Sequence, residues 1–463
     1  MSICVLMTDS TKRLLCLMMY LVLPGCQSVT DREPNILDIS VPDHWHGDVE
    51  RDEPVPTSWL SGFNDPQLTE MVQEGLANNF DLKSVSARVD AAREQVVISG
   101  AGRLPQLFFL PGYQRGKYDG IHGAAETGTF SALFTLNWEL DVWGRIHATQ
   151  EATRKDALAT TDDFRAAQLS LAARIAQTYF EWQEAQLQSD VAAQSVKDRS
   201  VIVNLVQGRF NKGLTRGLDL RLVLTDLANA EAQLAQTQND VQILGRRLQI
   251  LLGRYPDDHL ELKKTLPQPP STLLTGLPSE LLTRRPDVMA AFKRLCAMDA
   301  RLESAEKALF PRITLTAAGG TSSPALTELI DPRAVAWNVV SGLMQPIFTG
   351  GRLQADVRLN AAKVQDLFNQ YQSVSLNAFR EVEQALAAES RLRGQEKALQ
   401  EAVEQTKASR KLAVYSYQQG LIEILTLLDS FRSTLNTQSA HLKIQRQLLN
   451  NRISLYLALG GAV

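Results

Sequence analysis

Few residues of this chain have types and spacings suited to chemistry. His44 and His46 stand two residues apart, as metal ligands often do, but no third ligand is evident beside them. The sequence contains no Walker loop, no GxGxxG after a strand, no GxSxG and no HExxH. We therefore expect neither an enzyme nor a metal site.

One group of three residues has a spacing that would matter in a pore. Leu425 and Asp429 are four residues apart, and Arg432 follows three later, so all three share one helix face. As an ordinary surface ion pair, Asp429 and Arg432 would contribute roughly a few tenths of a kcal/mol. Repeated by symmetry around an axis, the three would form an apolar ring and a charged ring, which constrict pores and bias ion selectivity. The spacing alone leaves both interpretations open.

The start of the chain has the layout of a secretory signal. A Lys-Arg pair precedes an apolar run of about ten residues, Leu14 to Leu23, which is too short to span a bilayer. The following Pro24-Gly25-Cys26 resembles the lipobox of bacterial lipoproteins. We expect cleavage after residue 25 and a lipidated Cys26 that carries diacylglycerol and an N-terminal acyl chain such as palmitate. The alternative is an ordinary cysteine near the end of a signal peptide. Lipoproteins that stay in the inner membrane typically carry Asp after the lipidated cysteine, so Gln27 at this position favours the outer membrane.

An internal repeat organises the rest of the chain. Leu104-Pro105 matches Phe310-Pro311, 206 residues later, and after one inserted residue Leu252-Gly253 matches Leu459-Gly460. The prolines between the halves cannot continue a helix. We therefore expect five segments: a signal (1–25), a lipid-anchored polar tether (26–56), a first repeat (57–255), a Pro-rich connector (256–279) and a second repeat (280–463). We expect neither repeat to fold by itself.

Both repeats predict very long helices. Residues 145–207 contain no proline and precede an interruption at 208–217, after which an amphipathic pattern resumes. About 60 residues form a rod of roughly 90 Å, so such helices must pack side by side along their length.

The net charge of −3, from 48 Lys and Arg against 51 Asp and Glu, argues against nucleic acid as a partner.

Each repeat also predicts a pair of strands. Residues 130–142 alternate apolar and polar side chains, 335–347 do so more weakly, and further strands precede them at 106–115 and 312–321. Half-buried hairpins of a soluble protein would alternate too, but strands of about ten residues with one apolar face are typical of membrane barrels. Four strands cannot close a barrel, and an open edge is costly in hydrocarbon. Three copies would supply twelve strands, so a trimer is preferred, although a tetramer remains open.

With these elements in place, the sequence resembles the outer-membrane channels of tripartite efflux systems, the TolC/OprM-like family, in its lipoprotein (NodT-type) branch. The resemblance covers nearly the whole mature chain. Its motifs are Asp65-Pro66-Gln-Leu68, Arg284-Arg285-Pro286-Asp287-Val288, Phe310-Pro311-Arg312, Gly350-Gly351-Arg352 and Leu459-Gly460-Gly461.

The resemblance implies an α+β membrane protein. Three copies would form a 12-stranded transmembrane β-barrel, four strands from each, continued into the periplasm by a long α-helical barrel. It also implies a passive conduit that passes drugs or other small toxic compounds from an inner-membrane pump of the RND type and a periplasmic adaptor to the exterior, and hence a part in multidrug resistance.

The resemblance also assigns site residues. Leu425, Asp429 and Arg432 match the periplasmic gate of OprM-like relatives, and Asp219 matches, more weakly, an acidic position at the tip. Gly213 and Gly420 would form the turns at the helix tips, where an adaptor would dock.

Two other functions remain to be weighed. The same architecture could serve type I protein secretion. A periplasmic coiled-coil lipoprotein without a pore is a further alternative, but it would have no use for the alternating strand at 130–142. The sequence does not identify the exported substrate.

Overall fold

The computed structural model describes residues 32–38, 40–46, 59–120, 123–257, 262–269 and 277–461. The predicted signal and lipid site, Cys26 included, lie outside the described residues, as does most of the predicted tether.

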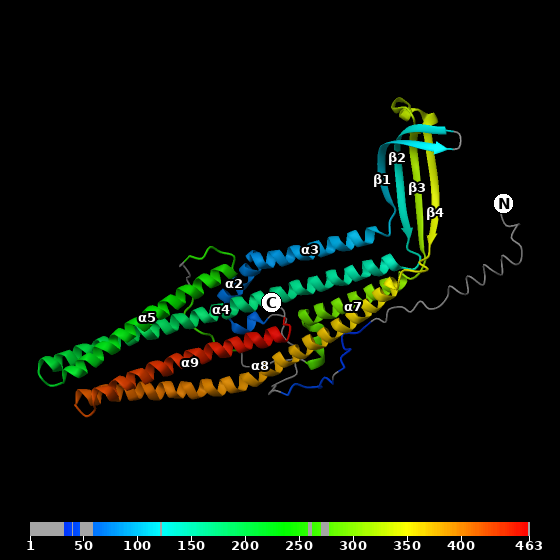
Figure 1. Cartoon of the computed structure of the whole chain (residues 1–463). Coiled ribbons are helices and arrows are strands. Elements are labelled where there is room, and N and C mark those ends of the chain that lie inside the picture. Colours follow the sequence, from blue (N-terminus) through cyan, green and yellow to red (C-terminus); the bar gives the residue numbers. More distant parts are fainter. Residues whose placement is uncertain are drawn as a thin grey trace. The chain divides into compact units, whose positions relative to one another are not determined.

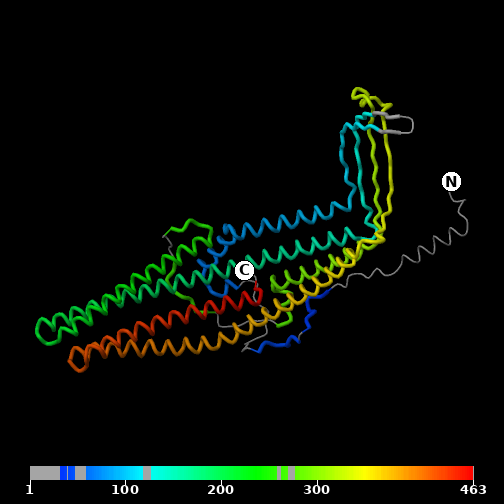
Figure 2. Tube along the Cα trace, in the orientation of Figure 1, coloured from blue at the N-terminus to red at the C-terminus, as the bar shows by residue number. Residues whose placement is uncertain are grey.

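The elements follow the predicted repeat (Figures 1 and 2). The first repeat contains η1 (Leu60–Phe63), α2 (Pro66–Asn78), α3 (Phe80–Ala101), β1 (Gln106–Gly120), β2 (Gly123–Leu140), α4 (Arg145–Asn211) and α5 (Gly217–Leu251). The second contains η2 (Pro278–Glu280), α6 (Leu281–Arg284), α7 (Pro286–Lys307), β3 (Arg312–Ser323), η3 (Leu326–Ile330), η4 (Pro332–Ala334), β4 (Val335–Met344), α8 (Arg352–Gln418) and α9 (Ile424–Ala458).

Corresponding helices have equal lengths in the two repeats. α3 and α7 have 22 residues each, α4 and α8 have 67, and α5 and α9 have 35. This equality confirms the internal repeat. One boundary differs from the prediction, because Gly208 lies inside α4 and the chain leaves the helix only after Asn211. A single glycine costs a helix only about 1 kcal/mol, which packing along a long helix can offset.

The four strands form one antiparallel sheet in the order β1-β2-β3-β4 (Figure 1). Its register places an apolar row from each of the four strands on one face. Rings pack in tilted pairs across β1 and β2 on that face, with centroids 4.9 Å apart for Phe109 and Phe134 and 4.4 Å for Tyr113 and Phe130. We call this surface the hydrocarbon face: Leu107, Phe109, Tyr113, Phe130, Phe134, Leu136, Trp138, Leu140, Ile313, Leu315, Val335, Trp337, Val339 and Leu343.

The described chain divides into two compact units, and each draws on both repeats. One contains the sheet and the adjoining helix ends, within Gly102–Ala152 and Met298–Val364. The other contains the remaining helices, within Leu37–Ala101, Thr153–Ala297 and Gln365–Val463. No helix in the described ranges is long and apolar enough to cross a membrane.

Three apolar clusters hold the helical unit together. The first joins α2, α4, α5 and α9 around the rings of Trp59, Phe63, Phe180 and Tyr456. The second lies among α7, α8 and α9, and the third joins the two helical hairpins near their turns.

Part of the predicted tether packs on the helical unit. Trp45 is buried in the second cluster, with its ring 6.2 Å from that of Phe379. The Gln372 side-chain amide donates to Asp38 at 2.9 Å, and the backbone N–H of His46 donates to Glu383 at 2.9 Å. This stretch is therefore anchored to α8 rather than free of the protein body.

Candidate functional site

Two turns connect the long helices of the helical unit, and both contain a glycine in the left-handed region. Gly213 has a φ of +71° and Gly420 a φ of +75°. At the first turn the N–H of Gly213 donates to Phe210 at 2.8 Å, and that of Leu214 donates to Arg209 at 2.9 Å. At the second, Gly420 and Leu421 repeat the same pair of bonds at 3.0 and 2.9 Å. These are Schellman ends, so the predicted turn glycines close α4 and α8.

We expect Gly420→Ala to lower the stability of the protein by about 1–2 kcal/mol, because an L-residue is disfavoured in the left-handed region. No heavy atom lies within 4 Å of a Cβ built on Gly420, so the loss comes from the backbone alone. Gly394 lies inside α8 with equally free space around it and serves as the matched control. Gly394→Ala should raise stability by about 1 kcal/mol. Thermal unfolding followed by circular dichroism tests both, and equal shifts for the two variants would refute the assignment.

Leu425, Asp429 and Arg432 all lie on the exposed side of α9, and we call this surface the gate face. Leu425 keeps 58% of its surface exposed, although it is apolar. The opposite side of the same turns packs into the third cluster through Ile424, Leu427, Leu428 and Phe431. Among the described residues, neither Asp429 nor Arg432 forms a hydrogen bond or ion pair, so the ordinary surface pair considered from the sequence is not formed.

Asp219 lies in the first turn of α5 and binds the turn that precedes it. Its carboxylate accepts a hydrogen bond from the Thr215 hydroxyl at 2.6 Å and from the backbone N–H of Arg216 at 3.3 Å. A carboxylate in the first turn also interacts favourably with the helix dipole. Asp219 therefore caps α5, a local role that the sequence analysis did not consider.

Tyr417 lies in the last turn of α8, and the sequence analysis did not identify it. Its ring lies 5.5 Å from the guanidinium carbon of Arg209 on α4, a cation–π distance. Burial raises the pKa of the Tyr417 hydroxyl, and the nearby Asp219 carboxylate raises it further. The end of α8 in one hairpin thus contacts the end of α4 in the other. The sequence signal that could have identified Tyr417 is the occurrence of tyrosines among the apolar positions of α8.

Two ion pairs join the long helices behind the turns. Arg199 of α4 binds Asp226 of α5 at 2.6 Å, and both side chains are almost fully buried. Arg410 of α8 binds Asp198 of α4 at 2.5 Å and lies 5.5 Å from the centre of the Phe431 ring. The second pair links the two hairpins, so separating them at this level would break it.

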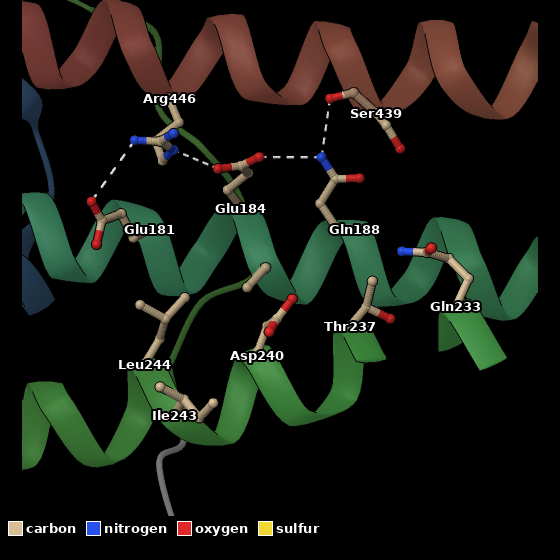
Figure 3. A pocket seen from close by; sticks show the side chains of 11 residues that line it. Glu181, Glu184, Gln188, Gln233, Thr237, Asp240, Ile243, Leu244, Ser439 and Arg446 are labelled. Atoms are coloured by element: carbon tan, nitrogen blue, oxygen red, sulfur yellow. Dashed lines mark hydrogen bonds and ion pairs between the residues drawn. The ribbon is translucent and has the colours of Figure 1, made fainter. Parts of the chain in front are cut away.

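Farther from the turns, a polar groove of about 560 Å³ lies between α4, α5 and α9 (Figure 3). Arg446 of α9 binds Glu184 of α4 at 2.5 Å and reaches Glu181 at 3.8 Å. The Gln188 amide donates to the backbone carbonyl of Ser439 at 3.0 Å. Arg446 thus neutralises Glu184 and lies close to Glu181, and these contacts join α4 to α9.

No cluster of three His, Cys, Asp or Glu side chains that could hold a metal ion occurs in the described ranges. Of the two histidines noted from the sequence, His46 donates its backbone N–H to the Glu383 carboxylate.

The chain thus combines a four-stranded sheet that has one apolar face with two long helical hairpins, an architecture that fits the subunit of an outer-membrane channel. Residues 71–254 and 277–461, one segment in each repeat, match the family "Outer membrane efflux protein". The chain belongs to this family.

Individual relatives agree with this assignment. The "Probable efflux pump outer membrane protein SepC" of Pseudomonas putida is 31% identical over 408 residues, which cover 87% of this chain and 85% of SepC. The "Cation efflux system protein CusC" of Escherichia coli is 32% identical over 414 residues, which cover 87% and 88% of the two chains. A crystal structure of a membrane protein from Pseudomonas aeruginosa superposes with a TM-score of 0.86 at 30% identity, covering 91% of this chain and 97% of that one.

The predicted fold class and function are therefore confirmed. The protein is an outer-membrane channel component of a tripartite efflux system, with a trimeric 12-stranded barrel in the Gram-negative outer membrane and a helical extension in the periplasm. Its family consists of transport conduits and not of enzymes.

Proposed function

We propose that this protein is a passive conduit whose periplasmic end is closed by the gate face, and that it exports small toxic compounds. The observation that carries the proposal is the two-sided character of α9 at its first turns. One side packs into the third cluster, whereas Leu425, Asp429 and Arg432 are exposed, and the two charged side chains have no ionic partner among the described residues. Three copies around an axis would turn these exposed side chains into an apolar ring and two charged rings.

We propose that the pump, rather than this channel, selects the exported compound. The "Toluene efflux pump outer membrane protein TtgF" of Pseudomonas putida is named for toluene and CusC for cations, although both are similar to this chain over most of its length. One channel architecture thus accompanies different cargoes. The energy for transport must come from a partner, and we propose that this partner is an inner-membrane pump of the RND type.

The turns at Gly213 and Gly420 form the proposed docking site for the periplasmic adaptor. Apolar side chains are exposed at both turns, with Leu214 and Leu218 at the first and Leu421 at the second. Exposed apolar side chains concentrated at two adjacent tips favour contact with another protein. We further propose that diacylglycerol and an acyl chain on Cys26 hold the mature N-terminus at the membrane.

Planar-bilayer recording of the purified protein tests the gated conduit. We expect discrete ion-conducting steps whose conductance is small, because the gate face closes the periplasmic end. Heat-treated protein is the control for contaminating channels. A correctly assembled trimer that gives no steps would refute a conduit, and a large conductance without any variant would refute the gate.

A further inference from the structure

An ion pair on α7 holds the first described residue of the predicted tether. The Nε of Arg32 donates to the Asp299 carboxylate at 2.6 Å, and a second guanidinium nitrogen donates to the other carboxylate oxygen at 3.1 Å. Two parallel bonds of this kind add geometric specificity to an arginine–carboxylate pair. The N-terminal side of the tether is therefore fixed at one place on α7.

The surroundings of Asp299 make this contact more than an ordinary surface pair. The Asp299 side chain keeps only 10% of its surface exposed, and its neighbours Met298 and Ala300 are buried. Burying a carboxylate is costly unless it is paired and hydrogen-bonded. α7 thus keeps an acidic side chain at a nearly buried position, where Arg32 from the tether pairs with it.

The ion pair lies close to the sheet. Asp299 lies eight residues before the last residue of α7, Lys307, a distance of about 12 Å along the helix. β3 begins at Arg312, five residues further on. Arg32, Asp299 and the sheet belong to the same compact unit, so the pair lies a short way from the helical end of the sheet.

Aromatic side chains lie between the ion pair and the sheet. Trp143 follows β2, stacks on Phe310 with ring centroids 5.3 Å apart, and donates its indole N–H to the Pro311 carbonyl at 2.7 Å. Tryptophan is enriched at the interface between membrane and water. We therefore expect the periplasmic surface of the bilayer near Phe310, with the ion pair on its periplasmic side.

The proposed lipid site is a short linker away from Arg32. Residues 27–31 separate Cys26 from Arg32, and six steps of an extended chain span at most about 22 Å. This linker is just long enough to bring the lipid from Asp299 past the rest of α7 to Phe310. Without the pair, the next contact described in the tether is that of Asp38 with Gln372, which would lengthen the linker to twelve steps.

We propose that the Arg32–Asp299 pair sets the length of the lipid linker and thereby holds the sheet of each new chain at the membrane surface for insertion. The inference rests on the proposed lipidation of Cys26. The effective concentration of two groups joined by a flexible linker falls roughly as the −3/2 power of linker length. Doubling the linker should therefore lower the concentration of the sheet at the membrane about threefold.

Removing the ion pair should slow assembly by a similar factor. Pulse-labelling of cells, followed by gels of unheated samples, measures how fast new full-length chains form the SDS-resistant trimer. Arg32→Ala with Asp299→Ala leaves neither charge unpaired, and we expect it to lower this rate about threefold. The matched control, Arg32→Asp with Asp299→Arg, restores a pair of opposite polarity and should recover most of the rate.

A second variant lengthens the linker and leaves the ion pair intact. Six Gly and Ser residues inserted after Ser28 double the linker and should also lower the rate about threefold. The same six residues inserted after Val49 lie beyond the contacts of the tether and should leave the rate unchanged. A normal rate for the Ser28 insertion would overturn the proposal, and a slow alanine variant beside it would mean that the pair only stabilises the fold.

A chain without lipid separates this inference from the proposed lipid anchor. Cys26→Ala, exported behind a secretory signal that is cleaved without lipidation, should form the trimer more slowly than every linker variant. A rate equal to that of the unmodified protein would refute the lipid anchor. A slow lipid-free chain, together with normal rates for the alanine variant and the Ser28 insertion, would overturn only the role of the Arg32–Asp299 pair.

Discussion

Replacing Asp429 and Arg432 together by alanine should raise the single-channel conductance of this protein several-fold. The two side chains are exposed on the gate face and form no ionic contact within the described chain, so their removal leaves the packed side of α9 intact. In a trimer the change would remove three carboxylates and three guanidinium groups from one short stretch of the pore. Both the constriction and the charge barrier that they create would be weakened.

The matched control keeps the charges of residues 429 and 432 and changes only the shapes of their side chains. Asp429→Glu with Arg432→Lys should leave the conductance near that of the unmodified protein, and ion selectivity should remain similar. Planar-bilayer recordings measure both properties, and the dissociation temperature in SDS reports assembly. Unchanged conductance of the double alanine variant, in a trimer of normal stability, would refute the gate assignment.

The repeat, the long helices and the strands could be predicted because each depends on a local pattern. Period-two alternation at residues 130–142 identifies the hydrocarbon face, and the register confirms that Phe130, Phe134 and Trp138 share it. Helix boundaries are less certain from sequence, since Gly208 differs from Gly213 in backbone conformation and not in residue type.

The tertiary contacts of the candidate site could not be predicted in the same way. Asp219 caps its own helix, whereas Tyr417 and Arg209 meet only because the two hairpins pack together. Arg410 and Asp198 are 212 residues apart in sequence, and nothing in either local pattern indicates that they pair. Adjacent residues such as Phe108 and Phe109 point to opposite faces of any strand, but both are apolar, so only the pairing of Phe109 with Phe134 shows which of them lies on the hydrocarbon face.

Buried charged side chains between the long helices could not be predicted from the sequence either, and they affect the stability of the protein. Arg452 of α9 is completely buried, and its guanidinium donates to Glu389 of α8 at 2.7 Å. Glu389 also accepts from Arg393 at 3.0 Å and from the Asn451 amide at 3.0 Å. An amphipathic pattern predicts an apolar residue at such positions, and burying a charge is costly unless it is paired and hydrogen-bonded.

We expect Arg452→Met to lower the stability of the protein by about 3 kcal/mol, at the lower end of the range for breaking a buried ion pair. Methionine fills the space of the arginine stem but leaves the Glu389 carboxylate buried, with Arg393 and Asn451 as its remaining partners. Denaturant unfolding of the detergent-solubilised protein, followed by circular dichroism, measures the change.

The compensating variant separates the cost of a buried carboxylate that has lost its buried arginine from the loss of packing. Glu389→Leu combined with Arg452→Met removes both buried charges, and replacing a buried pair by apolar residues of similar volume is often neutral. We therefore expect the double variant to recover most of the stability that Arg452→Met loses. A double variant as unstable as the single one would mean that the arginine acts through its packing between α8 and α9, and that its charge contributes little.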